Sequence, residues 1–332
     1  MQVQVQMPMS GRPTDGSPEI SVVIPTRNRC ARLGRTLGTA LSQEEVGVEV
    51  VVVDDGSTDA TPFWLANVAS DRLRVVRLPV PGGLPHARNA GLAVAEGSWI
   101  AFLDDDDLWS PRKLRSQLDA LAASGAGWTY GSAVYVKDDL SPISVEDAPS
   151  PEGLLERLLS EQAVPAGASN VVVRSDLAHE LGGFDERLPN MADWDLWLRL
   201  AERAPAVSCP DVVVARVQHR DNMHSQQHWR RFFQEFDRFA AVHEAQRAAL
   251  GITLDERPVA AWLAEASLRA GRPMAASMVN IRDGVRHRDL RSLRRAVRPF
   301  LGARRLRRSR SSVSAPAWLA PYRQLGPPGH IG

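Results

Sequence analysis

Four consecutive aspartates form the segment of this sequence with the clearest chemical potential. Residues 104–107 directly follow an apolar run, residues 99–103, that has the composition of a buried strand. Carboxylates placed this closely repel one another. A hard divalent cation such as Mn²⁺ or Mg²⁺, shared with the phosphates of a ligand, would relieve that repulsion. The alternative is a solvated acidic turn that caps the following helix.

A second polar cluster ends another apolar run. Residues 51–59 read VVVDDGSTD, so Asp54 and Asp55 stand at a strand end, and Gly56 lets the backbone approach a ligand closely. A carboxylate in this position can accept hydrogen bonds from the edge of a base or from a ribose. The alternative is an Asx-type turn that leads into a helix N-cap.

An arginine near a helix start is the third candidate. Residues 86–91 read HARNAG and follow a loop rich in proline and glycine. The guanidinium of Arg88 can form planar paired hydrogen bonds with a phosphate, and the helix N-terminus would add to the attraction. The alternatives are a surface ion pair for Arg88 and a capping role for His86.

The elements that would hold these clusters alternate between strand and helix. Apolar runs at residues 20–24, 48–53, 73–78 and 99–103 predict buried parallel strands, with helices between them, at residues 86–95 and from residue 110 onward. This alternation is typical of a doubly wound α/β sheet, whose ligands bind beyond the carboxyl ends of the strands. The three polar clusters, together with residues 26–29, should therefore converge on one edge.

The second half of the chain has a mixed pattern and then a helical one. Strands are expected at residues 128–136, 170–173 and 212–217, and a helix at 193–203 whose Trp194, Trp197, Leu198 and Ala201 have the spacing of core residues. Three or four helices should follow from residue 228 and end near residue 300. We expect disorder at residues 1–18 and in the basic tail at 302–332, which leaves a main domain at 19–227 and a helical region at 228–301.

Composition excludes several classes of protein. The 332 residues carry a net charge of +1, which excludes a globally basic nucleic-acid binder. The two cysteines, Cys30 and Cys209, lie in no disulfide framework or metal-ligand pattern. The first residues lack the pattern of a signal peptide, and no apolar run has the length of a membrane span, so we expect a cytoplasmic protein.

Taken together, the motifs resemble those of family 2 glycosyltransferases of the GT-A fold. The resemblance rests on PTRNR at 25–29, VVVDDGSTD at 51–59, ARNAG at 87–91, FLDDDD at 102–107, GGFDE at 182–186 and DWDLWLRL at 193–200, in the family's order and spacing. It implies a GT-A-type doubly wound mixed sheet, with a Rossmann-like nucleotide-binding half at 19–125, an acceptor half at 126–227 and a helical C-terminal extension.

The resemblance also implies roles for individual residues. Those that would bind the nucleotide sugar are Pro25, Thr26, Arg27, Asp55, Arg88, Asp104 and Asp105. Among these, Asp55 would contact the base, and Asp104 or Asp105 the ribose. Asp106 would be the ligand of a Mn²⁺ or Mg²⁺ ion, joined by His219, with His224 as a weaker alternative.

Asp193 occupies the position of the acid that deprotonates the acceptor in this family. The family usually has a glutamate directly before this residue, whereas this chain has Ala192. Asp195 lies two residues further along the predicted helix, so Asp193 and Asp195 cannot both face the site. In the GGFDE turn before them, Gly182 and Gly183 would have a conformational role.

The activity implied is that of a hexosyltransferase, which would move one sugar with inversion from a nucleotide diphosphate sugar to a small-molecule, glycan or peptide acceptor. UDP is the expected carrier, and the absence of the QxxRW signature, replaced by QQHWR at 226–230, favours single transfer. The alternatives are a sugar nucleotidyltransferase and a catalytically silent sugar-nucleotide-binding protein. The arginines between residues 286 and 310 suggest peripheral contact with the inner face of a membrane, or else a solvated helix and a loose tail.

Overall fold

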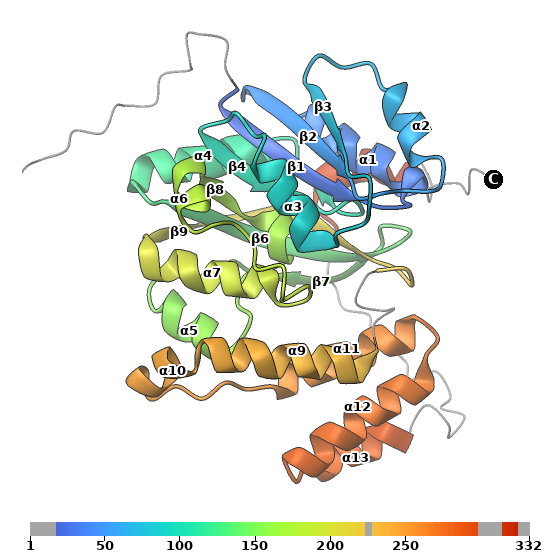
Figure 1. The fold of residues 1–332 in the computed structure, drawn as a ribbon, viewed down its shortest axis with the longest axis vertical. Helices are drawn as coiled ribbons and strands as arrows, with labels where there is room; N and C mark the ends of the chain where they lie inside the picture. The colour runs from blue at the N-terminus through green and yellow to red at the C-terminus, as the bar shows by residue number, and fades with distance from the viewer. Residues whose placement is uncertain (1–17, 223–227, 298–313, 325–332) are drawn as a thin grey trace, which may run out of the picture.

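A mixed sheet forms the centre of the molecule (Figure 1). The computed structural model describes residues 18–222, 228–297 and 314–324. Within these residues the sheet has nine strands in the order β3-β2-β1-β4-β8-β6-β9-β5, with β7 paired to β6 beside this path. The strands are β1 (Ile20–Thr26), β2 (Val48–Asp54), β3 (Leu73–Arg77), β4 (Trp99–Phe102), β5 (Leu108–Trp109), β6 (Trp128–Lys137), β7 (Pro142–Glu146), β8 (Val172–Arg174) and β9 (Ala206–Gln218).

Helices pack on the sheet and extend beyond it. Those of the sheet region are α1 (Cys30–Leu41), α2 (Thr61–Ala66), α3 (Leu84–Leu92), α4 (Lys113–Ser124), α5 (Leu154–Ser160), η1 (Gly167–Asn170), α6 (Ser175–Glu180) and α7 (Ala192–Arg203). Those that follow are α9 (Trp229–Val242), α10 (Glu244–Leu250), α11 (Arg257–Arg269), α12 (Pro273–Arg286), α13 (Leu290–Val297), η3 (Ala317–Leu319) and α14 (Ala320–Gln324).

Alternation along the first strands divides the core into two layers. On β1, Val23 packs in the cluster that contains α3 and α7, whereas Val22 and Ile24 pack in the cluster that contains α1 and α4. Both sets of side chains are fully buried, as the continuous apolar runs predict for a parallel sheet covered on both faces.

The strand pairing places the three polar clusters together. β1 pairs in parallel with β2 on one side and with β4 on the other, and Thr26 stands opposite Asp54. The residues that follow β1, β2 and β4 therefore meet at one edge of the sheet, as predicted. Beyond β4, the antiparallel strand β8 and the parallel pair β6 and β9 make the sheet mixed, which confirms the expected GT-A-type fold class.

Several predicted boundaries were wrong. β9 begins at Ala206, not at residue 212, because a register shift against β6 accommodates Pro210 within the strand. α3 begins at Leu84, not at residue 86, because Pro85 occupies its first turn, where a backbone amide has no partner inside the helix. The short elements β5, β7, α5 and α6 were not predicted, because a segment of so few residues shows little hydrophobic periodicity.

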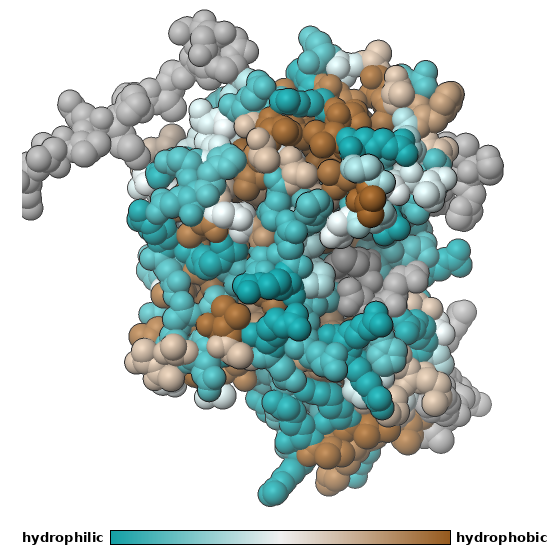
Figure 2. All heavy atoms as spheres, in the orientation of Figure 1, coloured by the Kyte–Doolittle hydropathy of each residue, from teal (hydrophilic) through white to brown (hydrophobic). Residues whose placement is uncertain are grey.

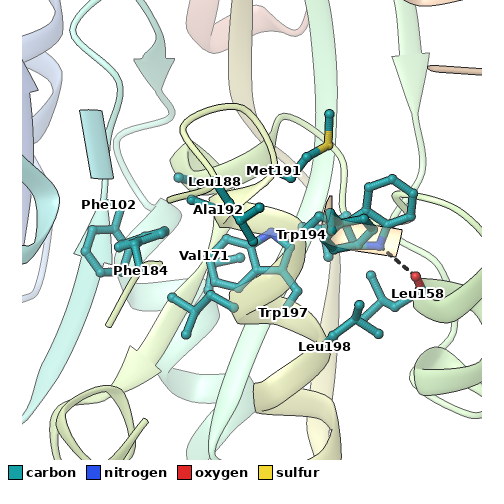
Figure 3. Packing of buried hydrophobic residues seen from close by; sticks show 14 of the residues in the cluster. Phe102, Leu158, Val171, Phe184, Leu188, Met191, Ala192, Trp194, Trp197 and Leu198 are labelled. Atoms are coloured by element: carbon teal, nitrogen blue, oxygen red, sulfur yellow. Dashed lines mark hydrogen bonds between the residues drawn. The ribbon is translucent and has the colours of Figure 1, made fainter. Parts of the chain in front are cut away.

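The C-terminal helices α9 to α13 outnumber the three or four expected, and they lie on the side of the molecule next to α5 and α7 (Figure 1). Trp194 of α7 packs against Phe239 of α9 with ring centroids 4.6 Å apart. The indole nitrogen of Trp194 donates a hydrogen bond to the Leu158 carbonyl at 2.6 Å, and Trp197 is fully buried beside it (Figure 3). The interpretation of both tryptophans as core residues is confirmed.

The prediction of a wholly disordered tail was wrong for residues 314–324. These residues return to the sheet, where Leu319 is fully buried among side chains of β6 and β9. Trp318 anchors the segment by donating a hydrogen bond to the Val212 carbonyl at 3.0 Å. Two apolar side chains in a tail rich in arginine and serine carry too weak a pattern to predict this packing. The remaining residues of both predicted disordered segments, except Pro18, lie outside the described residues.

Candidate functional site

A cavity of about 1150 Å³ opens at the edge where β1, β2 and β4 end. It brings together most of the residues that the sequence singled out for nucleotide-sugar and metal binding, namely Pro25, Thr26, Arg27, Asp55, Asp104, Asp105 and Asp106. Its lining also includes Asp107 and four further arginines, five with Arg27, so the cavity presents both carboxylates and guanidinium groups to a ligand. Arg88, Asp193 and His219 are not part of the lining.

The end of β1 is tied to the aspartate run and to the second polar cluster. The Thr26 hydroxyl donates a hydrogen bond to Asp105 at 2.7 Å. Asn28, in the left-handed conformation with φ 54°, accepts a hydrogen bond from the backbone amide of Thr58 at 2.8 Å. These contacts hold the PTRNR segment as a wall of the cavity.

Asp55 holds the loop that precedes α3. Its carboxylate accepts hydrogen bonds from the backbone amides of Gly82 at 2.6 Å and Gly83 at 3.0 Å. A Cβ atom at Gly82 would lie 2.1 Å from the ring of His86. The loop can therefore approach that ring this closely only if residue 82 is glycine. Asp55 therefore shapes the cavity, and its contact with a base stays a prediction.

Asp106 is the carboxylate of the run that faces the end of β9. Its Oδ2 atom lies 2.9 Å from Nε2 of His219 and accepts a hydrogen bond from Asn222 at 3.1 Å. Burial acts to raise the pKa of Asp106, but the hydrogen bond and charge of His219, with Arg29 and Arg216, lower it below its ordinary value. Asp106 is therefore held ionised, as a metal ligand requires.

The other aspartates of the run have different surroundings. Asp107 is buried and accepts hydrogen bonds from the Ser169 hydroxyl at 2.6 Å and from the Val217 amide at 3.0 Å, so it joins β9 and η1 to the run. Burial and the charge of Asp106 raise the pKa of Asp107 well above its usual range. Burial, and then the charge of Asp106, also raise the pKa of Asp105 to about 7.

Arg88 lies beneath the cavity between two carboxylates. Its guanidinium donates hydrogen bonds to Asp104 at 2.6 Å and to Asp193, and it lies over the ring of Phe184 at 5.0 Å. Only 1% of the Arg88 side chain is exposed, so the alternative of a surface ion pair is wrong. In this arrangement both ends of the guanidinium bind carboxylates, and a phosphate contact stays a prediction. His86 lies 3.1 Å from Glu186.

Asp193 and Asp195 have distinct surroundings although both lie in the first turn of α7. Asp193 accepts a hydrogen bond from the Ala168 amide at 3.2 Å and is partly exposed beside Arg88. Asp195 is buried, and its carboxylate bonds to Arg199 at 2.8 Å and to Nε2 of His243 at 3.0 Å. The expectation that the two side chains face different surroundings is confirmed.

Sequence reasoning missed several charged residues of the cavity. Arg216, near the end of β9, lines it, and Arg32 of α1 pairs with Asp138 at 2.5 Å. Burial acts to lower the pKa of Arg216, but Tyr135 and the aspartates of the run raise it, so its charge is secured. An arginine inside an apolar strand was the signal that could have identified Arg216, because such a position needs buried anionic partners.

The residues present fit a divalent cation that is shared with a ligand. Among the described residues, no group of three or more His, Cys, Asp or Glu side chains is arranged to enclose a metal ion. Mg²⁺ sites in nucleotide enzymes commonly use one or two carboxylates, with substrate phosphates and water completing the shell. The ionised Asp106 carboxylate at the cavity wall, next to His219, meets that requirement.

Comparison with known proteins identifies relatives among the glycosyltransferases. Residues 21–182 match the family model described as "Glycosyl transferase family 2". The succinoglycan biosynthesis protein ExoO of Rhizobium meliloti is 43% identical over 34% of this chain and 32% of its own length. The Escherichia coli protein named UDP-Glc:alpha-D-GlcNAc-diphosphoundecaprenol beta-1,3-glucosyltransferase WfgD is 28% identical over 36% of this chain and 47% of its own length. The chain thus spans less than half the length of each of these two curated relatives.

A solved structure shares the fold. Staphylococcus aureus TarS 1-349, in complex with UDP-GlcNAc, superposes with a TM-score of 0.56 over 83% of this chain and 89% of that chain. The two sequences are 18% identical, so this likeness concerns the fold.

Proposed function

The domain that spans residues 21–182 belongs to glycosyl transferase family 2, and on this premise we propose that the chain transfers a single sugar, with inversion, from a nucleotide diphosphate sugar to an acceptor hydroxyl. One observation carries the proposal. Arg88 joins Asp104, at the floor of the donor cavity, to Asp193, at the start of α7. This arrangement supports a donor site and a base that are connected by the buried guanidinium of Arg88.

Asp193 is the proposed general base. It would accept the proton of the acceptor hydroxyl as that oxygen attacks the anomeric carbon and the bond to the nucleoside diphosphate breaks. Asp193 accepts a hydrogen bond from Arg88 and lies in the first turn of α7. A base in hydrogen-bond reach typically contributes a rate factor of about 10² to 10⁴.

The donor side is proposed to hold a UDP-linked sugar and a divalent ion. The TarS structure of the same fold contains UDP-GlcNAc, and WfgD is named for a UDP-Glc donor. Asp106 and His219 would hold Mn²⁺ or Mg²⁺, which neutralises the charge that develops on a departing diphosphate. Thr26 and the five cavity arginines would orient the nucleotide and its phosphates.

The acceptor is proposed to be a glycan. This proposal rests on relatives whose names refer to succinoglycan biosynthesis and to a sugar carried on diphosphoundecaprenol. Cavity geometry favours no particular sugar hydroxyl.

The test is an assay of nucleoside diphosphate release from UDP-sugars, with and without glycan acceptors. We expect release that depends on acceptor, is abolished by EDTA and returns with Mn²⁺ or Mg²⁺. Full activity after rigorous chelation would remove the metal from the proposal. Formation of a nucleotide sugar from a nucleoside triphosphate would indicate a nucleotidyltransferase. Binding of the donor with no sugar transfer to any acceptor would indicate a catalytically silent sugar-nucleotide-binding protein.

A further inference from the structure

An exposed apolar stripe runs along α12. Met274, Met278, Ile281 and Val285 are between 36% and 67% exposed. They follow the spacing i, i+4, i+7 and i+11, so they lie within about 60° of one another around the helix. The opposite face of α12 is buried against α11 and α13. The stripe is therefore a surface feature and not a part of the core.

The neighbouring helix α13 has an exposed apolar side of its own, with arginines beside it. Leu290 is 68% and Val297 52% exposed, whereas Ser292 and Ala296 form the buried side of the helix. Arg291 and Arg294 are exposed, and no ion pair among the described residues engages either of them. The face thus combines apolar side chains with arginines whose charge is not neutralised by a described carboxylate.

This face lies at the end of the molecule away from the sheet. Figure 2 shows hydrophobic and hydrophilic surface side by side at the lower end, where Figure 1 places α12 and α13. Within the described part of the chain, no helix is long and apolar enough to cross a membrane. The sequence after α13 continues the basic character with Arg304, Arg305, Arg307, Arg308 and Arg310.

We use the name α12–α13 face for the apolar stripe of α12 together with Leu290, Arg291, Arg294 and Val297 of α13. We propose that this face docks on an anionic lipid surface, with the apolar stripe at the headgroup boundary and the arginines against lipid phosphates. Amphipathic helices with Lys or Arg beside a large apolar face bind membranes in this manner. A second copy of the chain fits less well, since a symmetric contact would bring the same arginines together. The proposal is independent of sugar transfer.

The test is flotation of the full chain with vesicles of phosphatidylcholine, with and without phosphatidylglycerol, in the absence of any donor. We expect flotation with the anionic vesicles alone, and a decrease when salt is raised, because salt screens the arginines. Absence of flotation with anionic vesicles at low salt would overturn the proposal.

Matched variants locate the contact. Ile281→Glu with Val285→Glu, and separately Arg291→Glu with Arg294→Glu, should each lower the partition coefficient by about tenfold or more. Phe63→Glu on α2 is the control, because Phe63 is 77% exposed and lies on the sheet region. All of these side chains are exposed, so thermal melting should confirm that each variant folds.

Three outcomes would contradict the proposal. Equal flotation of the face variants and the Phe63→Glu control would exclude the face. Loss of flotation only when the five arginines between residues 304 and 310 become glutamine would assign binding to the tail. Light scattering that shows a wild-type dimer, dissociated by Ile281→Glu with Val285→Glu, would assign the face to a second copy. Loss of acceptor-dependent release with intact flotation would contradict only the proposed activity.

Discussion

Asp193 and Asp195 are identical side chains in one helical turn, yet they have different surroundings. Asp193 is partly exposed and bonds to Arg88 beside the cavity, whereas Asp195 is buried between Arg199 and His243. Arg199 in turn donates hydrogen bonds to the carbonyls of Leu181 and Gly183, at the turn before α7. Asp195 therefore stabilises α7, the helix on which Asp193 lies.

Asparagine substitutions should separate the proposed catalytic role of Asp193 from the structural role of Asp195. Asp193→Asn keeps the shape of the side chain and removes its basicity, so we expect turnover to fall by about 10² to 10⁴ with nucleotide binding nearly unchanged. Asp195→Asn should lower the melting temperature and leave the turnover of the folded protein much closer to wild type. Steady-state kinetics with calorimetric titration of UDP would measure both. A larger loss of turnover for Asp195→Asn would transfer the base assignment to Asp195.

At the scale of elements, α9 supports the start of α7. Glu235 of α9 is buried and accepts hydrogen bonds from the backbone amides of Asn190 at 2.5 Å and Met191 at 2.9 Å. Burial raises the pKa of Glu235, although these hydrogen bonds oppose the increase. A carboxylate from α9 thus stands at the N-terminus of α7, in a chain where Ala192 replaces the acid usual in the family.

Glu235→Gln should loosen this junction. The two backbone amides donate to one carboxylate oxygen of Glu235, and the Asn190 side-chain amide donates to the other. The NH₂ group of glutamine cannot accept that third hydrogen bond, so we expect a loss of stability of about 1 to 3 kcal/mol. Displacement of Asp193 should also lower turnover by about tenfold or more, while the KM for the donor stays near wild type. Denaturant unfolding and steady-state kinetics would measure these effects.

Glu265→Gln is the control, since Glu265 on α11 is largely exposed and forms a long pair with Arg269 at 3.7 Å. Equal turnover in the two variants would show that the α9 contact does not position the base.

At the scale of the whole molecule, one apolar cluster joins the sheet region to the C-terminal helices. Val173 of β8, Trp197 of α7, Phe236 of α9 and Leu263 of α11 all belong to it. The helical region is therefore packed on the sheet region through a continuous core. Disruption of a buried group anywhere in that core should be measurable as a change in global stability.

Lys113 should make global stability depend on pH. The side chain is fully buried on α4, lies 4.1 Å from the Trp109 ring centroid and donates a hydrogen bond to Gln117. Burial lowers its pKa from 10.5 to about 7. Between these values the unfolded chain binds more protons than the folded one, so this group makes the free energy of unfolding rise with pH, by about 5 kcal/mol in all. Below pH 7 its destabilising effect is complete.

Lys113→Met removes this titration. The variant also leaves Gln117 without its donor, at a cost of about 1 to 3 kcal/mol, so the slope against pH is the relevant measurement and not the absolute stability. Denaturant unfolding from pH 6.5 to 10.5 should give a smaller rise in the variant than in wild type. Identical slopes would show that Lys113 stays protonated in the folded protein across this range.

The sequence by itself determined the first half of the fold and the edge where the site forms. Apolar runs such as residues 48–53 can only be buried strands, and parallel strands that alternate with helices must end on one side. The placement of Thr26, Asp55 and Asp104 around one cavity followed from that rule. Trp194 and Trp197 were identified as core residues because helical spacing is a local property.

Tertiary structure alone decided what these residues contact. Arg88 was expected at a phosphate, yet its guanidinium is buried between Asp104 and Asp193, which come from segments far apart in the chain. The support of α7 by Glu235 and the return of Leu319 to the sheet likewise join residues with no shared local pattern. Periodicity reports which face of an element is buried, but the partner on that face is set by packing across the whole chain.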